Sequence, residues 1–550
     1  MSQKIVRTYN GMFAGELTPE QIRNIVKIKE MTVVESLKGF VFDIPVEEVM
    51  KAADEGIGYR AYAKKNGIDI MKYRGELRDA QTVGLAFMYF SPKSLLGDSV
   101  GYGKTVEIAG LLNVLKGKNE MTRFMMAVEV SAVAQTLLEL LRRTGMNIIN
   151  LPSQTAKLEK VLYDIDFDNV DGMVVSHTLI ENNVFQTFLS KFVSGGRNKL
   201  FDTFILDESS VIKNENTKIF KNTEVINSYC TRVHYMNATP IENDILDAYN
   251  QIDAMDKSIM PKLSAIKKEY CVYKRGTYWV KENGKPVMKF RYDFDKYKNQ
   301  EDFKRRLGLI YIGRYMQDEK NKYRIEEVEP TDNQLIAMAM KYRASEILNC
   351  PTKLDQSKLR NKIELTEEGI PKLKRLKEIV QNECGGKKVM IYCFHRDAQD
   401  KIVEMLEGIG RKCVILNGSV MNDERHDTIN EFNEGDADTI VTNIKKSINL
   451  YDGDVCIIYS METNPAKLEQ LCGRIERHVD NKVKTYIMLI YAGTREEELV
   501  KKKMLERSNS ARDLVTGAES AINRFIDSDN DDENDSLDEG DKAGTEEKKA

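Results

Sequence analysis

Short apolar stretches alternate with helical patterns in two separate parts of the chain. In the first part the pattern predicts strands at 124–130, 172–176, 201–206 and 233–237, and helices at 106–115 and 132–141. In the second part it predicts strands at 388–394, 412–417, 439–442, 455–459 and 484–490, and helices at 398–409 and 424–432. Short buried strands separated by helices are typical of a parallel sheet covered on both faces. The sequence therefore predicts an α/β protein with two parallel-sheet lobes in tandem.

The segment between the two lobes does not continue this alternation of strands and helices. The pair Asn283-Gly284 stands between two extended segments and favours the two-residue turn of a β-hairpin. Basic residues interleaved with aromatic ones suit contact with a nucleic-acid backbone, and a solvated insertion explains them equally well. The predicted domains are an accessory segment at 1–70, lobe 1 at 71–250, an insertion at 251–350, lobe 2 at 351–515 and a disordered acidic tail at 516–550.

The composition is that of a soluble globular protein, with 41% hydrophobic and 31% charged residues in 550. No apolar run approaches the roughly 18–20 residues that a membrane helix needs, and the N-terminus does not resemble a secretory signal. We therefore expect a cytoplasmic protein, in the host cytoplasm if the chain is viral. The eight cysteines form no Cys-x-x-Cys pair, so neither a zinc site nor a redox motif is predicted.

The net charge of −4 hides an asymmetry along the chain. Residues 527–550 include eleven acidic and three basic residues and carry −8, so the preceding residues carry +4. A mildly basic body permits a polyanionic partner without requiring one. The tail has almost no large apolar side chains and is expected to be disordered. It is either a solubilising terminus or a segment that docks onto another protein.

A glycine-rich phosphate loop is the first candidate site. Residues 97–105 read Gly-Asp-Ser-Val-Gly-Tyr-Gly-Lys-Thr. The backbone around Gly101 and Gly103 would surround phosphate oxygens at the start of a helix, where N–H groups and the helix dipole favour anions. Lys104 would reach the β- and γ-phosphates, and Thr105 would place its hydroxyl on Mg²⁺.

An acidic pair follows about a hundred positions later. The stretch Thr-Phe-Ile-Leu-Asp-Glu at 203–208 is an apolar strand that ends in two carboxylates. Asp207 would hold the metal through its water shell, and Glu208 would orient or deprotonate the attacking water. Together with the phosphate loop, this pair predicts an enzyme that hydrolyses ATP with Mg²⁺.

Two arginines in the second lobe complete the predicted ATP site. The segment Gln-Leu-Cys-Gly-Arg-Ile-Glu-Arg at 470–477 places Arg474 and Arg477 three positions apart, so a helix would present both on one face. Guanidinium groups that reach a γ-phosphate stabilise the charge of the transition state.

These motifs together resemble those of a superfamily-two helicase, nearest to the Swi/Snf type of DNA translocase, over residues 75–510. The matching positions are 77–81, 98–105, 206–214, 237–243, 417–419, Arg425, 431–433, 448–450, 464–465, 470–477 and 493–497. The resemblance implies two RecA-like lobes and ATP hydrolysis coupled to tracking along duplex DNA. It also implies that Gln81 reads the adenine and that Asp98 and Gln470 contribute to nucleotide binding.

The same resemblance implies a set of DNA contacts in loops. These residues, each of which could also be an ordinary polar loop residue, are Ser131, Thr178, His395, Arg396 and Lys445. The chain departs from the family at 209–210, where Ser-Ser replaces the usual Ala-His. His177 is expected to lie in the core or to cap backbone, without a catalytic role. Such departures suggest a divergent, compact member of the family.

The expected function is that of a DNA-dependent ATPase acting on duplex, forked or branched DNA in replication, recombination or repair. One alternative is an RNA helicase, which the 238–240 and 212–214 segments disfavour. Another is an ATPase that remodels transcription complexes with RNA polymerase and binds its partner through the acidic tail or residues 1–70. A nucleotide switch with little turnover is disfavoured, because Glu208 and both arginines are present.

Overall fold

The computed structural model describes two sheets, the helices around them and several short segments. The described residues are 12–13, 39–43, 71–75, 77, 79–194, 200–241, 245–282, 285–315, 320–329, 371–418, 420, 422–444, 448–462, 464–476, 482–492, 495–498, 500–501 and 525–526. Most of the predicted accessory segment and nearly all of the predicted acidic tail lie outside these ranges. The chain divides into two compact units, lobe 1 with a seven-stranded sheet and lobe 2 with a six-stranded sheet.

Lobe 1 contains a sheet whose strands all run parallel. In spatial order its strands are β12 (Tyr311–Ile312), β4 (Lys93–Leu96), β9 (Arg232–Met236), β8 (Thr203–Asp207), β5 (Phe124–Val128), β7 (Gly172–Ser176) and β6 (Ile148–Asn150). The four strands predicted for lobe 1 are confirmed. The three shortest strands, β4, β6 and β12, were not predicted.

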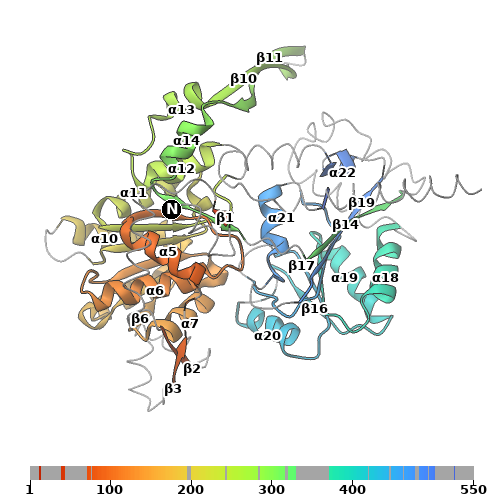
Figure 1. The fold of residues 1–550 in the computed structure, drawn as a ribbon, viewed down its shortest axis with the longest axis horizontal. Helices are drawn as coiled ribbons and strands as arrows, with labels where there is room; N and C mark the ends of the chain where they lie inside the picture. The colour runs from red at the N-terminus through yellow and green to blue at the C-terminus, as the bar shows by residue number, and fades with distance from the viewer. Residues whose placement is uncertain are drawn as a thin grey trace, which may run out of the picture. The chain divides into compact units, whose positions relative to one another are not determined.

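Both faces of the lobe 1 sheet are covered (Figure 1). One face packs against α5 (Asp79–Phe90), α6 (Lys104–Gly117) and α7 (Val133–Thr144). The other packs against α8 (Thr155–Asp164), α9 (His177–Ile180), α10 (Asn183–Ser194), α11 (Lys218–Tyr229) and α12 (Ile245–Met255). All five residues of β5 are fully buried and alternate between the two cores. This burial explains why the strands read as continuous apolar runs.

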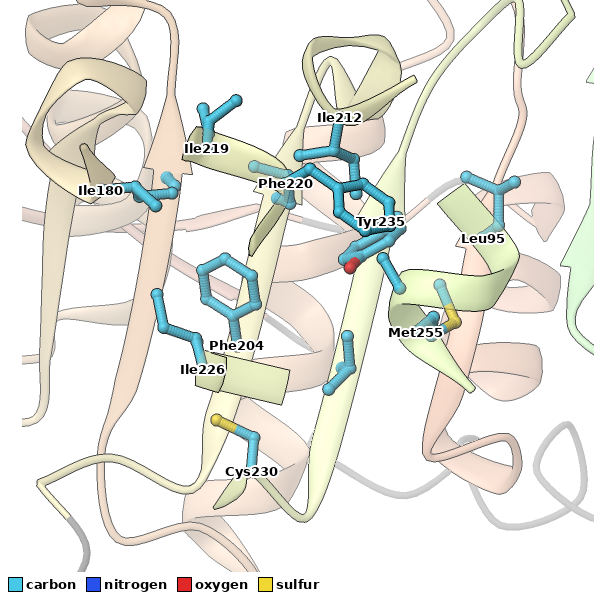
Figure 2. Close-up of a cluster of buried hydrophobic side chains, with 14 of the residues drawn as sticks. Leu95, Ile180, Phe204, Ile212, Ile219, Phe220, Ile226, Cys230, Tyr235 and Met255 are labelled. Atoms are coloured by element: carbon cyan, nitrogen blue, oxygen red, sulfur yellow. The ribbon is translucent and has the colours of Figure 1, made fainter. Parts of the chain in front are cut away.

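The core beneath α11 and α12 supports the site described below. Figure 2 shows Phe220 and Ile226 of α11, Met255 of α12 and Tyr235 of β9 in this cluster of buried side chains. Each of these side chains is at most 4% exposed. Close packing of this kind resists displacement, so α12 is held firmly against the sheet.

The predicted insertion at 251–350 contains a hairpin, and the segment after the hairpin adds strands to the two sheets. After α13 (Leu263–Tyr270), β10 (Cys271–Glu282) pairs antiparallel with β11 (Lys285–Tyr297). Glu282 pairs with Lys285, which confirms the hairpin predicted at Asn283-Gly284. In Figure 1 this hairpin extends away from the sheet, beyond α13 and α14 (Gln300–Leu307). Further along, β12 joins the lobe 1 sheet and β14 (Lys322–Val328) joins the lobe 2 sheet, so the segment after the hairpin contributes one strand to each lobe.

Lobe 2 contains a second, entirely parallel sheet. In spatial order its strands are β14, β19 (Thr485–Tyr491), β18 (Val455–Ile458), β15 (Val389–Tyr392), β17 (Thr439–Thr442) and β16 (Cys413–Leu416). Helices α18 (Pro371–Glu383) and α19 (Arg396–Glu407) cover one face, and α20 (Asn422–Asn433) and α21 (Pro465–Cys472) cover the other. The five strands and two helices predicted for this lobe are confirmed.

Several small elements complete the described structure. They are β1 (Met12–Phe13), which pairs with β13 (Arg314–Tyr315), the pair β2 (Gly39–Asp43) and β3 (Met71–Gly75), and α22 (Arg495–Glu498). Short 3₁₀ helices lie at Val130–Ala132 (η2), Phe167–Asn169 (η3) and Ser209–Ile212 (η4). Among the described residues, no helix is both long enough and apolar enough to span a membrane.

Candidate ATP site and nucleic-acid interface

The loops that carry the predicted motifs of lobe 1 lie at one edge of its sheet. Because the strands are parallel, the segments that follow their carboxyl ends meet at that edge. The phosphate loop follows β4, the 237–240 loop follows β9, and Asp207 ends β8. The strand order β4-β9-β8 places the 237–240 loop between the phosphate loop and the acidic pair.

The phosphate loop has the backbone that its glycines permit. Gly103 precedes α6 with φ 92° and Gly101 has φ 78°, both in the left-handed region that side chains disfavour. Helix α6 begins at Lys104, so the N–H groups of Lys104 and Thr105 have no carbonyl partner within the helix. The Lys104 ammonium donates to the Asp98 carbonyl at 2.7 Å and to the Ser99 carbonyl at 3.3 Å. The ammonium is therefore held over the loop.

This loop fits the phosphates of a nucleotide. The Ser99 hydroxyl is a buried polar atom without a hydrogen-bond partner in the structure, as expected of a group that meets a ligand. Lys104 and Thr105 are half-buried, so both remain accessible from the edge of the sheet. An ammonium, a hydroxyl and helix N–H groups are the donors and metal ligand that a magnesium nucleotide requires.

The acidic pair lies two strands away from the phosphate loop, about 10 Å at the usual strand spacing. Both carboxylates are half-buried, and Glu208 has the left-handed backbone conformation φ 49°, ψ 54°. The imidazole of His177 donates from Nε2 to the Asp207 carbonyl at 2.9 Å; Nε2 must carry the hydrogen because a carbonyl only accepts. His177 thus caps backbone, one of the two roles expected for it.

Asp98 lies beneath the phosphate loop, in a buried charge cluster. Its Oδ1 accepts from the Arg314 backbone N–H at 3.0 Å and from Arg314 Nε at 2.9 Å, and its Oδ2 pairs with Arg314 Nη2. Arg314 Nη2 also donates to Glu107 of α6 at 2.6 Å. Asp98, which was expected to contribute to nucleotide binding, is therefore paired with Arg314 of β13. This pairing holds the start of the phosphate loop in place.

The cluster places two carboxyls around one guanidinium, and all three residues are at most 1% exposed. Burial raises the pKa of Glu107 well above its usual range, and the Asp98 charge adds to this effect while Arg314 opposes it. A Cβ atom on Gly84 of α5 would overlap the Glu107 carboxyl and the Arg314 guanidinium. The glycine at 84 is therefore required by the close approach of this cluster.

The two predicted glutamines are both buried. Gln81 lies on α5 and is 4% exposed, and Gln470 lies on α21 and is 1% exposed.

Of the two arginines predicted in lobe 2, only Arg474 lies within the described residues. Helix α21 ends at Cys472, so Arg474 lies in the turn after it rather than on a continuing helix. The Arg474 guanidinium donates to the Gln470 carbonyl at 2.9 Å and to the Ile448 carbonyl at 3.0 Å within lobe 2. The prediction of a helix through 474 was wrong because the chain leaves the helix at Gly473. Arg477 lies outside the described residues.

The predicted DNA contacts of lobe 1 lie at the same carboxyl edge. Ser131 lies in η2 after β5, and Thr178 lies in α9 after the neighbouring strand β7. Thr178 is exposed, and its hydroxyl forms a 2.8 Å hydrogen bond with the Ser176 hydroxyl. Ser131 is half-buried.

In lobe 2 the described candidates follow β15. Arg396 opens α19 and is exposed, whereas His395 is only 8% exposed. Burial makes the imidazole a poor candidate for a DNA contact, so Arg396 is the better placed of the two. Lys445 lies outside the described residues.

Four residues near these sites were missed by the sequence analysis. Arg314, Glu107 and Gln251 are buried and contact motif residues, and no local sequence signal marks them. Phe394 ends the turn after β15 and is 48% exposed beside the candidate DNA contacts. An aromatic residue two positions after the end of a buried strand could have indicated it.

Comparison with known proteins gives the following matches. The family model described as "Helicase conserved C-terminal domain" matches residues 371–479, which include most of the lobe 2 sheet. The Bacillus subtilis protein named "Putative ATP-dependent helicase/translocase YwqA" is 22% identical over 494 residues, covering 82% of this chain and 50% of its own length. The DNA repair protein rhp54 of Schizosaccharomyces pombe is 22% identical over 511 residues, covering 79% of this chain and 58% of its own length. The chain thus spans about half the length of these relatives.

A solved structure is also similar. The Sulfolobus solfataricus SWI2/SNF2 ATPase core in complex with double-stranded DNA is 19% identical, with a TM-score of 0.37, and the match covers 80% of this chain and 97% of that one. The matched C-terminal helicase domain, the likenesses over 82% and 79% of the chain, and the phosphate loop with its acidic pair make the chain similar to superfamily-two helicases with an ATPase core of the SWI2/SNF2 type.

Proposed function

We propose that the chain is an ATP-driven motor that translocates along duplex or branched DNA. The observation that carries the proposal is the edge of the lobe 1 sheet, where the phosphate loop, the 237–240 loop and the acidic pair follow neighbouring strands. A phosphate-binding loop beside a strand that ends in Asp-Glu is the arrangement needed to bind and hydrolyse a nucleoside triphosphate.

The proposal assigns a role to each motif residue. Lys104 would neutralise the β- and γ-phosphates, and Thr105 and Asp207 would hold Mg²⁺, directly and through water. Bound Mg²⁺-ATP supplies the phosphoanhydride bond that is cleaved. Glu208 would orient and deprotonate the attacking water, and Arg474 and Arg477 would stabilise the charge of the transition state.

The proposed DNA contacts are Ser131 and Thr178 in lobe 1 and Arg396 in lobe 2. Side chains of this kind contact phosphates and sugars and therefore carry little sequence information. The relatives' names include a helicase/translocase and a DNA repair protein. We therefore propose a role in replication, recombination or repair, with a forked or branched duplex as the substrate.

The test is ATP hydrolysis by the purified full chain, alone and with duplex DNA, forked DNA, single-stranded DNA or RNA. Stimulation by duplex or forked DNA supports the proposal. Stimulation by RNA alone would replace it with an RNA helicase, and stimulation by no nucleic acid would favour a factor activated by a protein partner.

The matched control separates this activity from a contaminating ATPase. Glu208→Gln keeps the size of the side chain but removes the carboxylate that would act on water. It should lower kcat at least 100-fold and leave binding of a fluorescent ATP analogue intact. Wild-type turnover in this variant would mean that the measured hydrolysis does not depend on Glu208, and would overturn its assignment as the catalytic base.

A further inference from the structure

A buried glutamine joins the segment after the acidic pair to the loop after β9. Gln251 lies on α12 and is fully buried. Its Oε1 accepts from the Ser209 hydroxyl at 2.6 Å and from Asn237 Nδ2 at 3.0 Å. Ser209 directly follows Glu208, and Asn237 is the first residue after β9. One side-chain oxygen therefore bridges two loops at the edge that carries the proposed ATP site.

The other end of the same amide fixes its orientation. Gln251 Nε2 donates to the Pro240 carbonyl at 2.9 Å and to the Asp247 carbonyl at 2.7 Å. Carbonyls only accept, so the NH₂ group must face them and the oxygen must face Ser209 and Asn237. All four hydrogen-bonding positions of the amide are occupied, and the side chain has no second orientation of equal energy.

The neighbouring residue of α12, Asn250, also binds the segment that follows Glu208. Asn250 Nδ2 donates to the Lys213 carbonyl at 2.6 Å, just past the end of η4. Adjacent residues of one helix thus hold both ends of the 3₁₀ turn that follows Glu208. The helix itself is anchored in the core by Ile252 and Met255, the latter visible in Figure 2. These bonds therefore tie the two loops to a fixed support.

We propose that Gln251 is a positioning residue that makes the Glu208 segment and the 237–240 loop move as one unit. A shift of either loop must carry the other along or break buried hydrogen bonds, and an unpaired buried polar group is costly. On the proposed function, the 237–240 loop would transmit the state of the ATP site to the DNA-binding surface. Gln251 would then set how strongly DNA stimulates hydrolysis, without touching ATP or DNA.

The matched control is a second buried amide that contacts the same helix but neither loop. Asn227 of α11 is 5% exposed and donates to the Tyr235 hydroxyl and the Ala254 carbonyl, both at 2.6 Å. Asn227→Leu removes a buried amide that donates to α12, and Gln251→Leu removes a buried amide that belongs to α12. A purely structural role for Gln251 predicts that both variants lose stability and behave alike in every other respect.

The first measurement is steady-state ATP hydrolysis at saturating duplex DNA and without DNA. Gln251→Leu should lower the ratio of stimulated to basal kcat about 10-fold, with the KM for ATP changed less than about 3-fold. Asn227→Leu should keep the wild-type ratio. Ser209→Ala should lower the ratio in the wild-type background and have less than about 2-fold further effect beside Gln251→Leu, because the two residues act through one bond. Equal ratios in both leucine variants would overturn the proposal.

The second measurement does not depend on DNA stimulation. Hydrogen exchange followed by mass spectrometry should show faster exchange in both the 208–213 and 237–241 peptides of Gln251→Leu, and in neither peptide of Asn227→Leu. Faster exchange in only one of the two peptides would overturn the coupling. A wild-type enzyme that DNA does not stimulate would refute the proposed function, and the exchange result would still decide the role of Gln251.

Discussion

Arg314 and Asp98 lie 216 positions apart and form a buried ion pair beneath the phosphate loop. The pairing of β12 with β4 brings them together, because Arg314 follows β12 as Asp98 follows β4. Asp98 accepts from both the backbone and the side chain of Arg314, so the start of the loop is tied to β13 at more than one atom. The shape of the phosphate loop therefore depends on a strand that follows the long hairpin.

Removing the arginine should destabilise lobe 1 strongly. Arg314→Met would leave Asp98 and Glu107 buried without their counter-charge, which costs about 3–5 kcal/mol. Urea denaturation followed by circular dichroism should show this loss in the lobe 1 transition, and the KM for ATP should rise. The matched control is Arg305→Ala on α14, where the arginine side chain is 65% exposed and pairs with Asp302 at the surface; it should cost about 0–1 kcal/mol. Equal losses in the two variants would refute the role of the buried cluster.

A buried histidine should make lobe 1 sensitive to acid. His234 of β9 is fully buried and forms a 2.7 Å hydrogen bond between Nδ1 and the Ser94 hydroxyl of β4. Burial lowers its pKa to about 3, and the Arg232 charge adds to this effect. The unfolded chain binds a proton at this residue below about pH 6.5 and the folded chain does not, so stability falls as pH decreases from 6.5 towards 3. Between pH 7 and pH 5 the loss should be about 2 kcal/mol.

The test of this prediction is the urea midpoint at both pH values. His234→Gln keeps a polar group beside Ser94 and cannot titrate. The variant should lose about 2 kcal/mol less than the wild type on going from pH 7 to pH 5. If both proteins lose the same amount, other groups cause the acid sensitivity.

Most of the sheets could be predicted from the sequence, because their central strands are buried on both faces. The five residues of β5 form an apolar run, and β7 has Met-Val-Val at its centre and is buried at all five positions. The elements that were missed, β6 with three residues and β12 with two, are too short to show any period. They exist because neighbouring strands of the sheet offer them hydrogen-bond partners, which is tertiary information.

The residues of the candidate site also fall into two groups, those that local motifs reveal and those that only the fold reveals. Lys104, Asp207 and Glu208 belong to local motifs, so the sequence places Lys104 at a helix start and the acidic pair at a strand end without knowledge of the fold. Arg314 could not be found, because its partner lies 216 positions earlier in the chain. The end of α21 was overlooked despite a signal, since Gly473 is a residue type that favours helix termination.

Arg396 should contribute one phosphate contact to DNA binding. It is exposed at the start of α19, after the carboxyl end of β15. Arg396→Ala should weaken duplex binding and reduce the slope of log K against log[salt] by about 0.9. Lys401→Ala is the matched control, because Lys401 is an exposed cation further along the same helix. A variant at 396 that binds with the wild-type slope would exclude this contact.

The β10–β11 hairpin should provide further contacts to DNA. Among the described strands, β10 and β11 pair only with each other, and residues 271–297 include seven basic and three acidic residues. A two-stranded ribbon of net charge +4 suits a polyanion, and its width matches the major groove of duplex DNA. We therefore expect the hairpin to add to the affinity for duplex and to its dependence on salt.

The expectation can be tested by shortening the ribbon without disturbing the core. Arg275 faces Tyr292 across the hairpin, so an Asn-Gly turn can replace residues 276–291 and retain Tyr273, which packs against the lobe 1 core. The shortened chain should keep the Tm of the wild type and bind duplex DNA more weakly, with a shallower salt slope. A full-length variant with Lys281, Lys285, Lys289 and Arg291 changed to Gln should bind in the same way, because charge and not length is the cause. Wild-type affinity and slope in both variants would show that the hairpin is a solvated insertion.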